Sequence, residues 1–370
     1  MSLWLFPRPQ WGVSGVLFAK AAALPLWVAW RTLRASLRGG PGYRGAVSDH
    51  FDGQHFFNPH GSAGRPLADV LRWQRTRVRK PWPPWREQNQ TVSLPSQLAA
   101  GELAITFVNH VTFLLQFAGL TLLTDPVYSQ RASPVQWLGP RRRHAPGIAF
   151  ERLPRLDAVF ISHNHYDHLD LPTLLRLDAT HAPLFVTGLG NGAFLREWGL
   201  RRVVELDWWQ HTRLNDVQLL FTPAQHWSTR GPGSRNRTLW GGAWLSQGSR
   251  SVYFCGDSGY GPLFGELRQR CGSPDIALLP IGAYLPRWFM HDQHMDPAEA
   301  VQVHRTLGAK LSVGCHFGCF PLADEGIDEP LVELASAQAA LGVSRSEFLT
   351  LAPGETLLWR GASRSLHVTA

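Results

Sequence analysis

Metal-binding side chains are concentrated in residues 161–170, ISHNHYDHLD, where the apolar run LDAVFI ends. His163 and His165 alternate, so both rings point to the same side if the segment is extended. Asp167 and His168 follow at the turn that leaves the strand. Neutral imidazole and carboxylate groups bind zinc and similar divalent ions at about 2.0–2.2 Å. Because unpaired charges beside a buried strand are costly, the segment predicts a metal site rather than a solvated loop.

Three later strand ends supply further candidate ligands. His226 follows FTPAQ, Asp257 follows VYFCG and His316 follows LSVGC, each just beyond an apolar run. A single histidine at a strand end is more often a structural residue, so each candidate depends on the others. The chain has no G-x-S-x-G elbow, so we expect no serine nucleophile.

The elements that position these side chains are short strands that alternate with helices. Apolar runs of strand length lie at 104–107, 112–117, 156–161, 183–187, 217–222, 251–255, 276–281 and 310–313. Helices are expected to begin after the cap residues Asp170, Asp296 and Asp328, and Glu299 completes a capping box with Asp296. This alternation predicts a layered α/β domain.

The basic charge of the chain is concentrated at its N-terminus. Residues 1–86 hold 13 of the 36 Lys and Arg residues and three of the 28 acids, which leaves 23 basic and 25 acidic residues in the body. The near-neutral body argues against a polynucleotide substrate. The four cysteines of the chain are too few for a disulfide scaffold, so we expect buried, reduced thiols, which favours a cytoplasmic environment.

The sequence divides into an N-terminal extension, 1–86, and a body, 87–370. Within residues 1–40, apolar stretches bounded by tryptophan are followed by arginines. This composition predicts a membrane anchor and, for the extension as a whole, an anionic membrane surface as partner. Lys20 and Pro25 disfavour a full span, so an interfacial anchor, a weak span and a helix packed on the body all stay open.

The motifs together resemble those of the metallo-β-lactamase superfamily, and within it the N-acylphosphatidylethanolamine-hydrolysing phospholipase D family. The motifs that carry the resemblance are SDHFDG (48–53), FNP (57–59), TDPVYS (124–129), RASP (131–134), SHNHYDH (162–168), PAQHW (223–227), GDSG (256–259), IGAYLPRWFM (281–290), QHMDP (293–297) and CHFG (315–318). The resemblance implies a four-layer αββα sandwich with a binuclear site on one edge. Asn109 departs from the family pattern, in which glycine is more common before the histidine.

The resemblance also implies a role for each ligand. One metal ion would be held by His163, His165 and His226, the second by Asp167, His168 and His316, with Asp257 bridging the two. Asp167, Asp257 and His294 would be the catalytic residues, His294 as a substrate-polarising or proton-transfer group, although a structural histidine before the Asp296 cap is also compatible with the sequence. His110 would at most contact a ligand, and His304 is expected in a packing or surface position.

The implied function is a phospholipase-D-like hydrolase of N-acyl-phosphatidylethanolamine-like glycerophospholipids. Two zinc ions, with iron or manganese as alternatives, would activate a bridging hydroxide for attack on phosphorus. Tyr284, Arg287 and Trp288 would contact the substrate, although an ordinary rim position is equally compatible with the sequence. A membrane-associated enzyme facing the cytoplasm is expected, and a homodimer is possible.

Two other functions are compatible with the same residues. One is a soluble hydrolase of a small lactone or cyclic phosphodiester. The other is a non-catalytic membrane-associated scaffold that keeps metal for stability, which the complete set of ligand candidates disfavours.

Overall fold

The computed structural model describes residues 40–61, 65–88, 92, 94–95, 98–99, 101–360 and 367–369. The predicted membrane anchor therefore lies outside the described residues, apart from residue 40. Among the helices that are described, none is long and apolar enough to cross a membrane.

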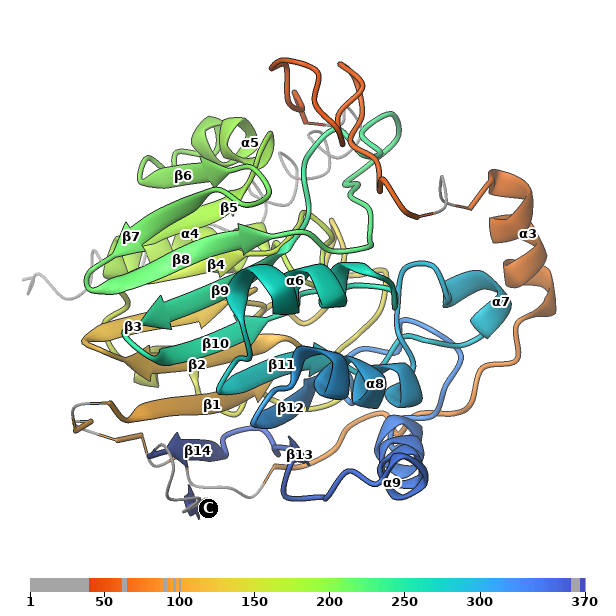
Figure 1. Ribbon diagram of the computed structural model, residues 1–370. Coiled ribbons are helices and arrows are strands. Elements are labelled where there is room, and N and C mark those ends of the chain that lie inside the picture. The colour runs from red at the N-terminus through yellow and green to blue at the C-terminus, as the bar shows by residue number, and fades with distance from the viewer. Residues whose placement is uncertain are drawn as a thin grey trace, which may run out of the picture.

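Two mixed sheets form the centre of the molecule (Figure 1). The first has the order β15 (His367–Thr369), β14 (Thr356–Trp359), β1 (Leu103–Asn109), β2 (Thr112–Phe117), β3 (Leu120–Thr124), β4 (Ala158–Ile161), β5 (Leu184–Gly188) and β6 (Val203–Leu206). The second has the order β13 (Phe348–Thr350), β12 (Leu311–Cys315), β11 (Ile276–Pro280), β10 (Arg250–Phe254), β9 (Gly242–Gln247), β8 (Val217–Thr222) and β7 (His211–Leu214). All eight predicted strand segments are confirmed, with small shifts at their ends.

Helices cover the outer faces of both sheets. The described helices are α3 (Leu67–Thr76), the short 3-10 helix η1 (Phe150–Arg152), α4 (Leu171–His181), α5 (Asn191–Glu197), α6 (Leu263–Cys271), α7 (Arg287–Met290), α8 (Pro297–Leu307) and α9 (Glu329–Leu341). In Figure 1, α6 and α8 lie over the second sheet, while α4 and α5 lie on the first. The expected αββα sandwich is confirmed.

Three apolar clusters hold these four layers together. The central cluster joins the facing sides of the two sheets, for example Phe107 and Phe160 of the first sheet with Phe221 and Phe254 of the second, all at most 2% exposed. Two outer clusters pack α4 and α5 on the first sheet and α6, α8 and α9 on the second. Removing water from these faces is the main stabilising contribution to the sandwich.

The predicted helix starts differ in how they are capped. Asp296 and Glu299 form the expected capping box at α8. Asp170 makes no side-chain cap bond at α4 and instead accepts from the backbone N–H groups of Tyr128 and Ser129 at 3.1 and 2.9 Å. The carboxylate of Asp170 therefore holds the loop after β3 in place, which corrects the predicted cap. Asp328 also makes no cap bond and pairs with Arg86 instead.

Other expectations concern the cysteines and the chain before β1. All four cysteines are free, as expected, and three are buried.

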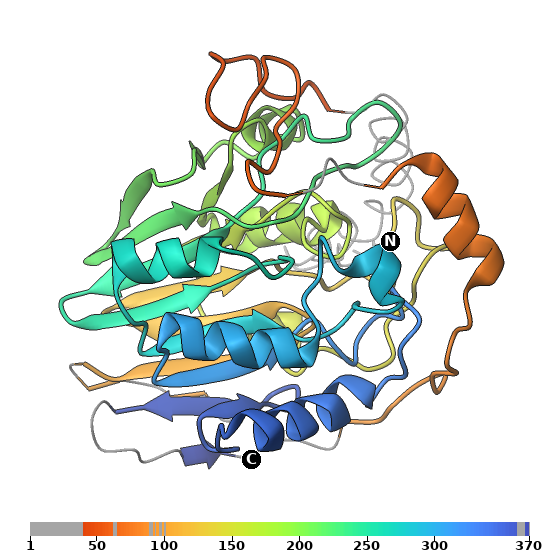
Figure 2. The ribbon, with the colours of Figure 1, turned by 45° about the vertical axis from the view of Figure 1, so that its right-hand side comes forward.

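Residues 65–86 lie along the body, where Trp73 donates to the Asp324 carboxylate at 2.8 Å and Arg77 pairs with the same group at 2.8 Å. Figure 2 shows α3 standing at the edge of the sandwich beside α7. The division at residue 86 stays a prediction.

Candidate metal centre

The candidate ligands come from strand ends that meet at one edge of the sandwich. Strands β8, β10 and β12 run in the same direction, because β9 is antiparallel to both β8 and β10, and β10 to β12 are parallel. Their ends place His226, Asp257 and His316 opposite the segment that follows β4 of the first sheet. In Figure 1 this edge faces α7 and α3. The fold thus brings together all seven predicted ligands.

His163, His165 and His226 form the first ligand group. His165 Nδ1 lies 2.8 Å from His163 Nε2 and 3.3 Å from His226 Nε2. Two nitrogens bound to one tetrahedral zinc ion at about 2.05 Å are separated by about 3.4 Å. The spacing of the three nitrogens is therefore close to that of a zinc site and needs an adjustment of about half an ångström.

Asp257 links a second ligand group to the first. Its Oδ2 lies 3.1 Å from His168 Nε2, 3.2 Å from His316 Nε2 and 3.8 Å from His226 Nε2. Asp167 Oδ2 lies 3.4 Å from both His168 Nε2 and His316 Nε2. One carboxylate thus faces ligands of both groups, which is the arrangement that a bridging ligand requires.

Several buried polar atoms in this cluster form no hydrogen bond with the described residues. Among the described residues, His168 Nε2, His316 Nε2 and Asp257 Oδ1 are buried without a hydrogen bond. Buried polar groups are nearly always satisfied in folded proteins, so unsatisfied atoms gathered in one cluster indicate a site that binds a ligand. The imidazole and carboxylate donor set fits two divalent metal ions.

Neighbouring groups fix the orientation of the ligand rings. Asp125 is fully buried and accepts from His168 Nδ1 at 2.7 Å and from the Ser162 hydroxyl at 2.6 Å. His226 Nδ1 donates to the Gln293 carbonyl at 2.9 Å. Such contacts select the ring nitrogen that is free to bind metal. As expected, His110 contacts a ligand, with Nε2 3.0 Å from Asp167 Oδ2.

The first group is electrically neutral at pH 7. Burial, reinforced by the neighbouring histidines, lowers the pKa of His165 to about 3. Burial also lowers the pKa of His226 to about 4, and that of His163 well below its usual value. Neutral imidazole is the form that binds metal, so these three rings need no deprotonation before they bind an ion.

In the second ligand group, Asp167, His168 and His316, the carboxylates stabilise positive charge on the two histidine rings. Burial opposes the protonation of His168 and His316, but the carboxylates of Asp257 and Asp167 outweigh it. They raise the pKa of His316 to about 9 and that of His168 well above its usual value. In return, burial opposes the charge of Asp257, yet His168 and His316 hold its pKa well below the ordinary range. A divalent cation would replace the two protons as the compensating charge.

His294 and the three predicted substrate residues occupy different positions. His294 lines the site, with Nδ1 3.8 Å from Asp257 Oδ2. Tyr284 is 1% exposed and Arg287 is paired with Glu299 at 2.7 Å. Trp288 is 37% exposed and contacts Arg72. Substrate contacts by Tyr284, Arg287 and Trp288 stay a prediction, since none of the three lines the cavity beside the ligands.

A cavity of about 270 Å³ opens beside the ligand cluster. Its polar side is formed by the ligand residues and His294, and its other side carries the apolar side chains Val70, Trp73, Trp227, Phe289, Met290 and Leu322. A second cavity of about 480 Å³ adjoins the first and shares Arg65, Trp227, Arg235 and Gln293 with it. We call the two together the metal-site groove.

Two arginines lie where the two cavities meet. The guanidinium of Arg235 is stacked 4.4 Å from the centre of the Trp227 ring, and burial lowers the pKa of Arg235. In the described part of the chain no carboxylate pairs with Arg235, whereas Arg65 pairs with Asp292 at 2.9 Å. The groove therefore carries a partly buried cation close to the metal ligands.

Comparison with known proteins agrees with this geometry. The profile of the beta-lactamase superfamily domain matches residues 121–317, just over half of the chain. The chain belongs to the metallo-β-lactamase superfamily. A phospholipase D of Caenorhabditis elegans, named as hydrolysing N-acyl-phosphatidylethanolamine, is 34% identical over 277 residues, 71% of this chain and 77% of the relative. The match also shows membership of that family.

Two further comparisons define the extent of the likeness. An uncharacterised protein of Mycobacterium tuberculosis is 42% identical over 244 residues, which are 64% of this chain and 64% of the mycobacterial protein. The chain thus matches slightly less than two thirds of that relative. Igni18, a metallo hydrolase from the archaeon Ignicoccus hospitalis, has the same superfamily fold, with a TM-score of 0.54 at 20% identity over 70% of this chain and 99% of that one.

Sequence reasoning assigned no role to three residues of the site. Asp125 lies within the TDPVYS motif, but its partner His168 is 43 residues away in sequence. Trp227 and Arg235 were also missed as groove residues. The motif PAQHW could have indicated Trp227, because this residue directly follows the ligand His226. Arg235 lies in a turn-rich segment without a pattern that indicates a site.

Proposed function

We propose that the protein is a metal-dependent phosphodiesterase of phospholipase D type that hydrolyses N-acyl-phosphatidylethanolamine-like glycerophospholipids. The observation that carries the proposal is the metal-site groove, in which the ligand cluster meets an apolar wall and Arg235, which pairs with no carboxylate among the described residues. A lipid phosphodiester needs these three features together. The named activity of the Caenorhabditis elegans relative supports the same substrate class.

The donor set suits two zinc ions, with iron or manganese as alternatives. The first ion would be held by His163, His165 and His226, and the second by Asp167, His168 and His316, with Asp257 shared. When bound, such ions lower the pKa of water toward neutrality and stabilise negative charge on a phosphoryl oxygen.

Residues of the groove would bind and orient the lipid. Arg235 is the proposed partner of the phosphate, because its guanidinium lines the groove over Trp227 and guanidinium groups bind phosphate oxygens strongly. Phe289 and Met290 are the proposed contacts of the acyl chains and would keep water from the groove.

The reaction transfers one water molecule across the phosphodiester. The bond between phosphorus and the oxygen of the N-acylethanolamine breaks, water supplies the hydroxyl to phosphorus, and its other proton goes to the leaving alkoxide. His294 is the proposed proton-transfer group, since it lies 3.8 Å from Asp257 at the wall of the groove. Burial holds its pKa well below the usual value, so its ring is neutral.

A substrate panel tests the proposal. Purified protein loaded with zinc is given N-acyl-phosphatidylethanolamine, plain phosphatidylethanolamine, a soluble phosphodiester and a small lactone, and the products are identified by mass spectrometry. Phosphatidic acid and N-acylethanolamine are the expected products, and they should disappear in Asp257→Asn. Turnover of the lactone or the soluble phosphodiester alone would instead support the second function kept open by the sequence.

A further inference from the structure

The loop between β3 and η1 exposes two large apolar side chains. Trp137 is 75% exposed and Leu138 is 61% exposed. The loop is ordered by its own contacts, since Arg131 Nε donates to the Gln136 carbonyl at 3.1 Å and Ala132 N–H to the Pro140 carbonyl at 3.1 Å. A fixed loop that holds neighbouring tryptophan and leucine side chains in water indicates an interaction surface.

Arginines line a cavity that begins directly after this apolar tip, at Gly139. A cavity of about 550 Å³ is lined by Arg79, Arg131, Arg141 and Arg143, together with Gly139, Pro140 and Pro321. In the part of the chain that the structure describes, none of these four arginines forms an ion pair with a carboxylate. The sequence from residue 126 to residue 150 also contains no Asp or Glu. The cavity is therefore an uncompensated cationic site.

Exposed apolar side chains next to these arginines suit a partner with an apolar interior and negatively charged surface groups. We propose that Trp137, Leu138 and the four arginines form a docking surface for a lipid bilayer that contains anionic phospholipids. Tryptophan and leucine would enter the interfacial region, and the arginines would bind the phosphate groups. A second copy of the chain is a poorer complement, because a symmetric contact through this loop would bring arginine against arginine.

The docking surface lies beside the metal-site groove. Figure 2 shows the loop, in yellow, on the same side of the sandwich as α3. Arg79 follows α3, whose Val70 and Trp73 line the groove, and Leu322 of the groove directly follows Pro321 of the cationic cavity. Docking would therefore place the groove at the membrane surface. The surface would bind a bilayer whichever ester the metal site cleaves.

Vesicle sedimentation tests the proposal on the full chain without substrate. Vesicles of phosphatidylcholine are compared with vesicles that also contain phosphatidylglycerol. At about 1 kcal/mol for each arginine near an anionic surface, Arg79→Gln with Arg141→Gln should weaken binding about 30-fold at low salt. Trp137→Ser with Leu138→Ser should weaken binding to the same vesicles, with less dependence on salt.

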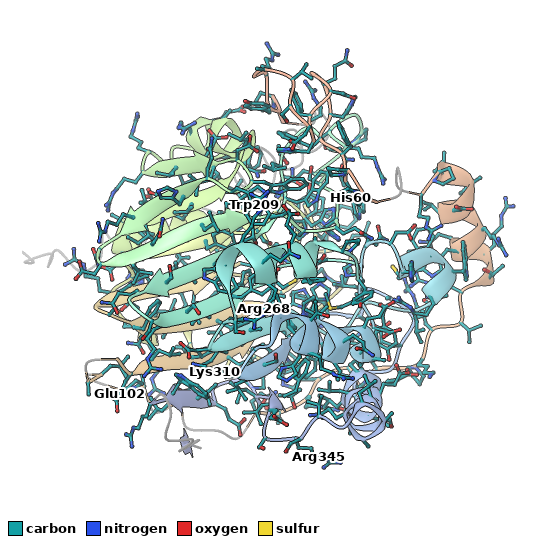
Figure 3. All side chains as sticks on the ribbon, viewed as in Figure 1. His60, Glu102, Trp209, Arg268, Lys310 and Arg345 are labelled. Atoms are coloured by element: carbon teal, nitrogen blue, oxygen red, sulfur yellow. The ribbon has the colours of Figure 1, made fainter. Side chains whose placement is uncertain are left out.

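A matched control uses two exposed arginines away from this loop. Figure 3 shows Arg268 on the front of the molecule and Arg345 at its foot, so Arg268→Gln with Arg345→Gln should bind like the unchanged protein. Residues 1–39 are also basic and would contribute to vesicle binding equally in every variant. The proposal is therefore tested by the difference in binding between the variants. Unchanged binding by both test pairs would overturn the proposal. A change of oligomeric state in sedimentation velocity, with vesicle binding unaltered, would overturn it in favour of a second copy.

Discussion

Replacing Asp125 by asparagine should release one metal ion before the other. Asp125 accepts from the Ser162 N–H at 2.7 Å through Oδ1, and from His168 Nδ1 at 2.7 Å through Oδ2. Its backbone φ is +33°, a region that asparagine tolerates, so the change affects mainly the side chain. If the amide oxygen keeps the bond to Ser162, the amide nitrogen faces His168 Nδ1, and two donors oppose each other.

The opposed donors change the form of the metal ligand. His168 would relieve the conflict by moving its proton to Nε2, the atom that faces Asp257. A protonated Nε2 cannot bind metal, and losses of this kind of contact typically cost about 10–100-fold in metal affinity. The second ion, held by Asp167, His168 and His316, should therefore dissociate first.

The assay is metal content by elemental analysis after dialysis against graded chelator. Asp275→Asn is the control, because Asp275 is 1% exposed and accepts from the Ser251 N–H at 3.0 Å and from Lys310 at 2.6 Å. Figure 3 shows Lys310 at the end of the sheet away from α7. Retention of both ions by the Asp125 variant at unchanged chelator strength, or equal loss in the control, would refute the reasoning.

Three further predictions concern the groove, acid stability and the end of β10. Arg235→Gln should raise KM for a phospholipid about tenfold or more with little change in kcat, because a charged hydrogen bond contributes about 1.5–3 kcal/mol; an unchanged KM contradicts the role. Burial lowers the pKa of His144 to about 4, so its neutral ring stabilises the metal-free protein fully above pH 6.5 and loses that contribution as the pH falls toward 4. His144→Gln should remove about 3 kcal/mol of this pH dependence in urea unfolding. Gly256→Ala should lower the unfolding free energy by about 1–2 kcal/mol, because φ is +65° and the new Cβ lies 2.9 Å from Ser162 Cβ, and it should weaken metal retention at Asp257; a melting temperature and metal content like those of the unchanged protein would exclude this.

The ligand positions were predictable because they depend on local rules. Alternation places His163 and His165 on one side of an extended segment, and strands that run in the same direction bring their ends to one edge. His226, Asp257 and His316 lie one to four residues beyond the ends of β8, β10 and β12, so strand assignment made them candidates, and the resemblance to the family selected them as ligands. The same reasoning predicted a layered α/β domain, and every predicted strand segment forms part of a sheet, whereas the αββα order of the layers came from the resemblance to the family.

Side-chain directions in the loops were not predictable in this way. Tyr284 points inward because the Glu325 carboxylate accepts the N–H groups of Ala283 at 2.6 Å and Leu285 at 3.2 Å. Glu325 is 40 or more residues away in sequence, so no local pattern reveals this contact. Arg287 is likewise held by Glu299, whose place in the capping box was predicted but whose second partner was not.

The central claim is a binuclear site that hydrolyses a lipid phosphodiester. The most direct test titrates zinc into the metal-free protein while phosphatidic acid released from N-acyl-phosphatidylethanolamine is measured. The seven converging ligands predict that release rises to a plateau at two zinc ions per chain. A plateau at one ion, or no phosphatidic acid at any zinc content, would contradict the account.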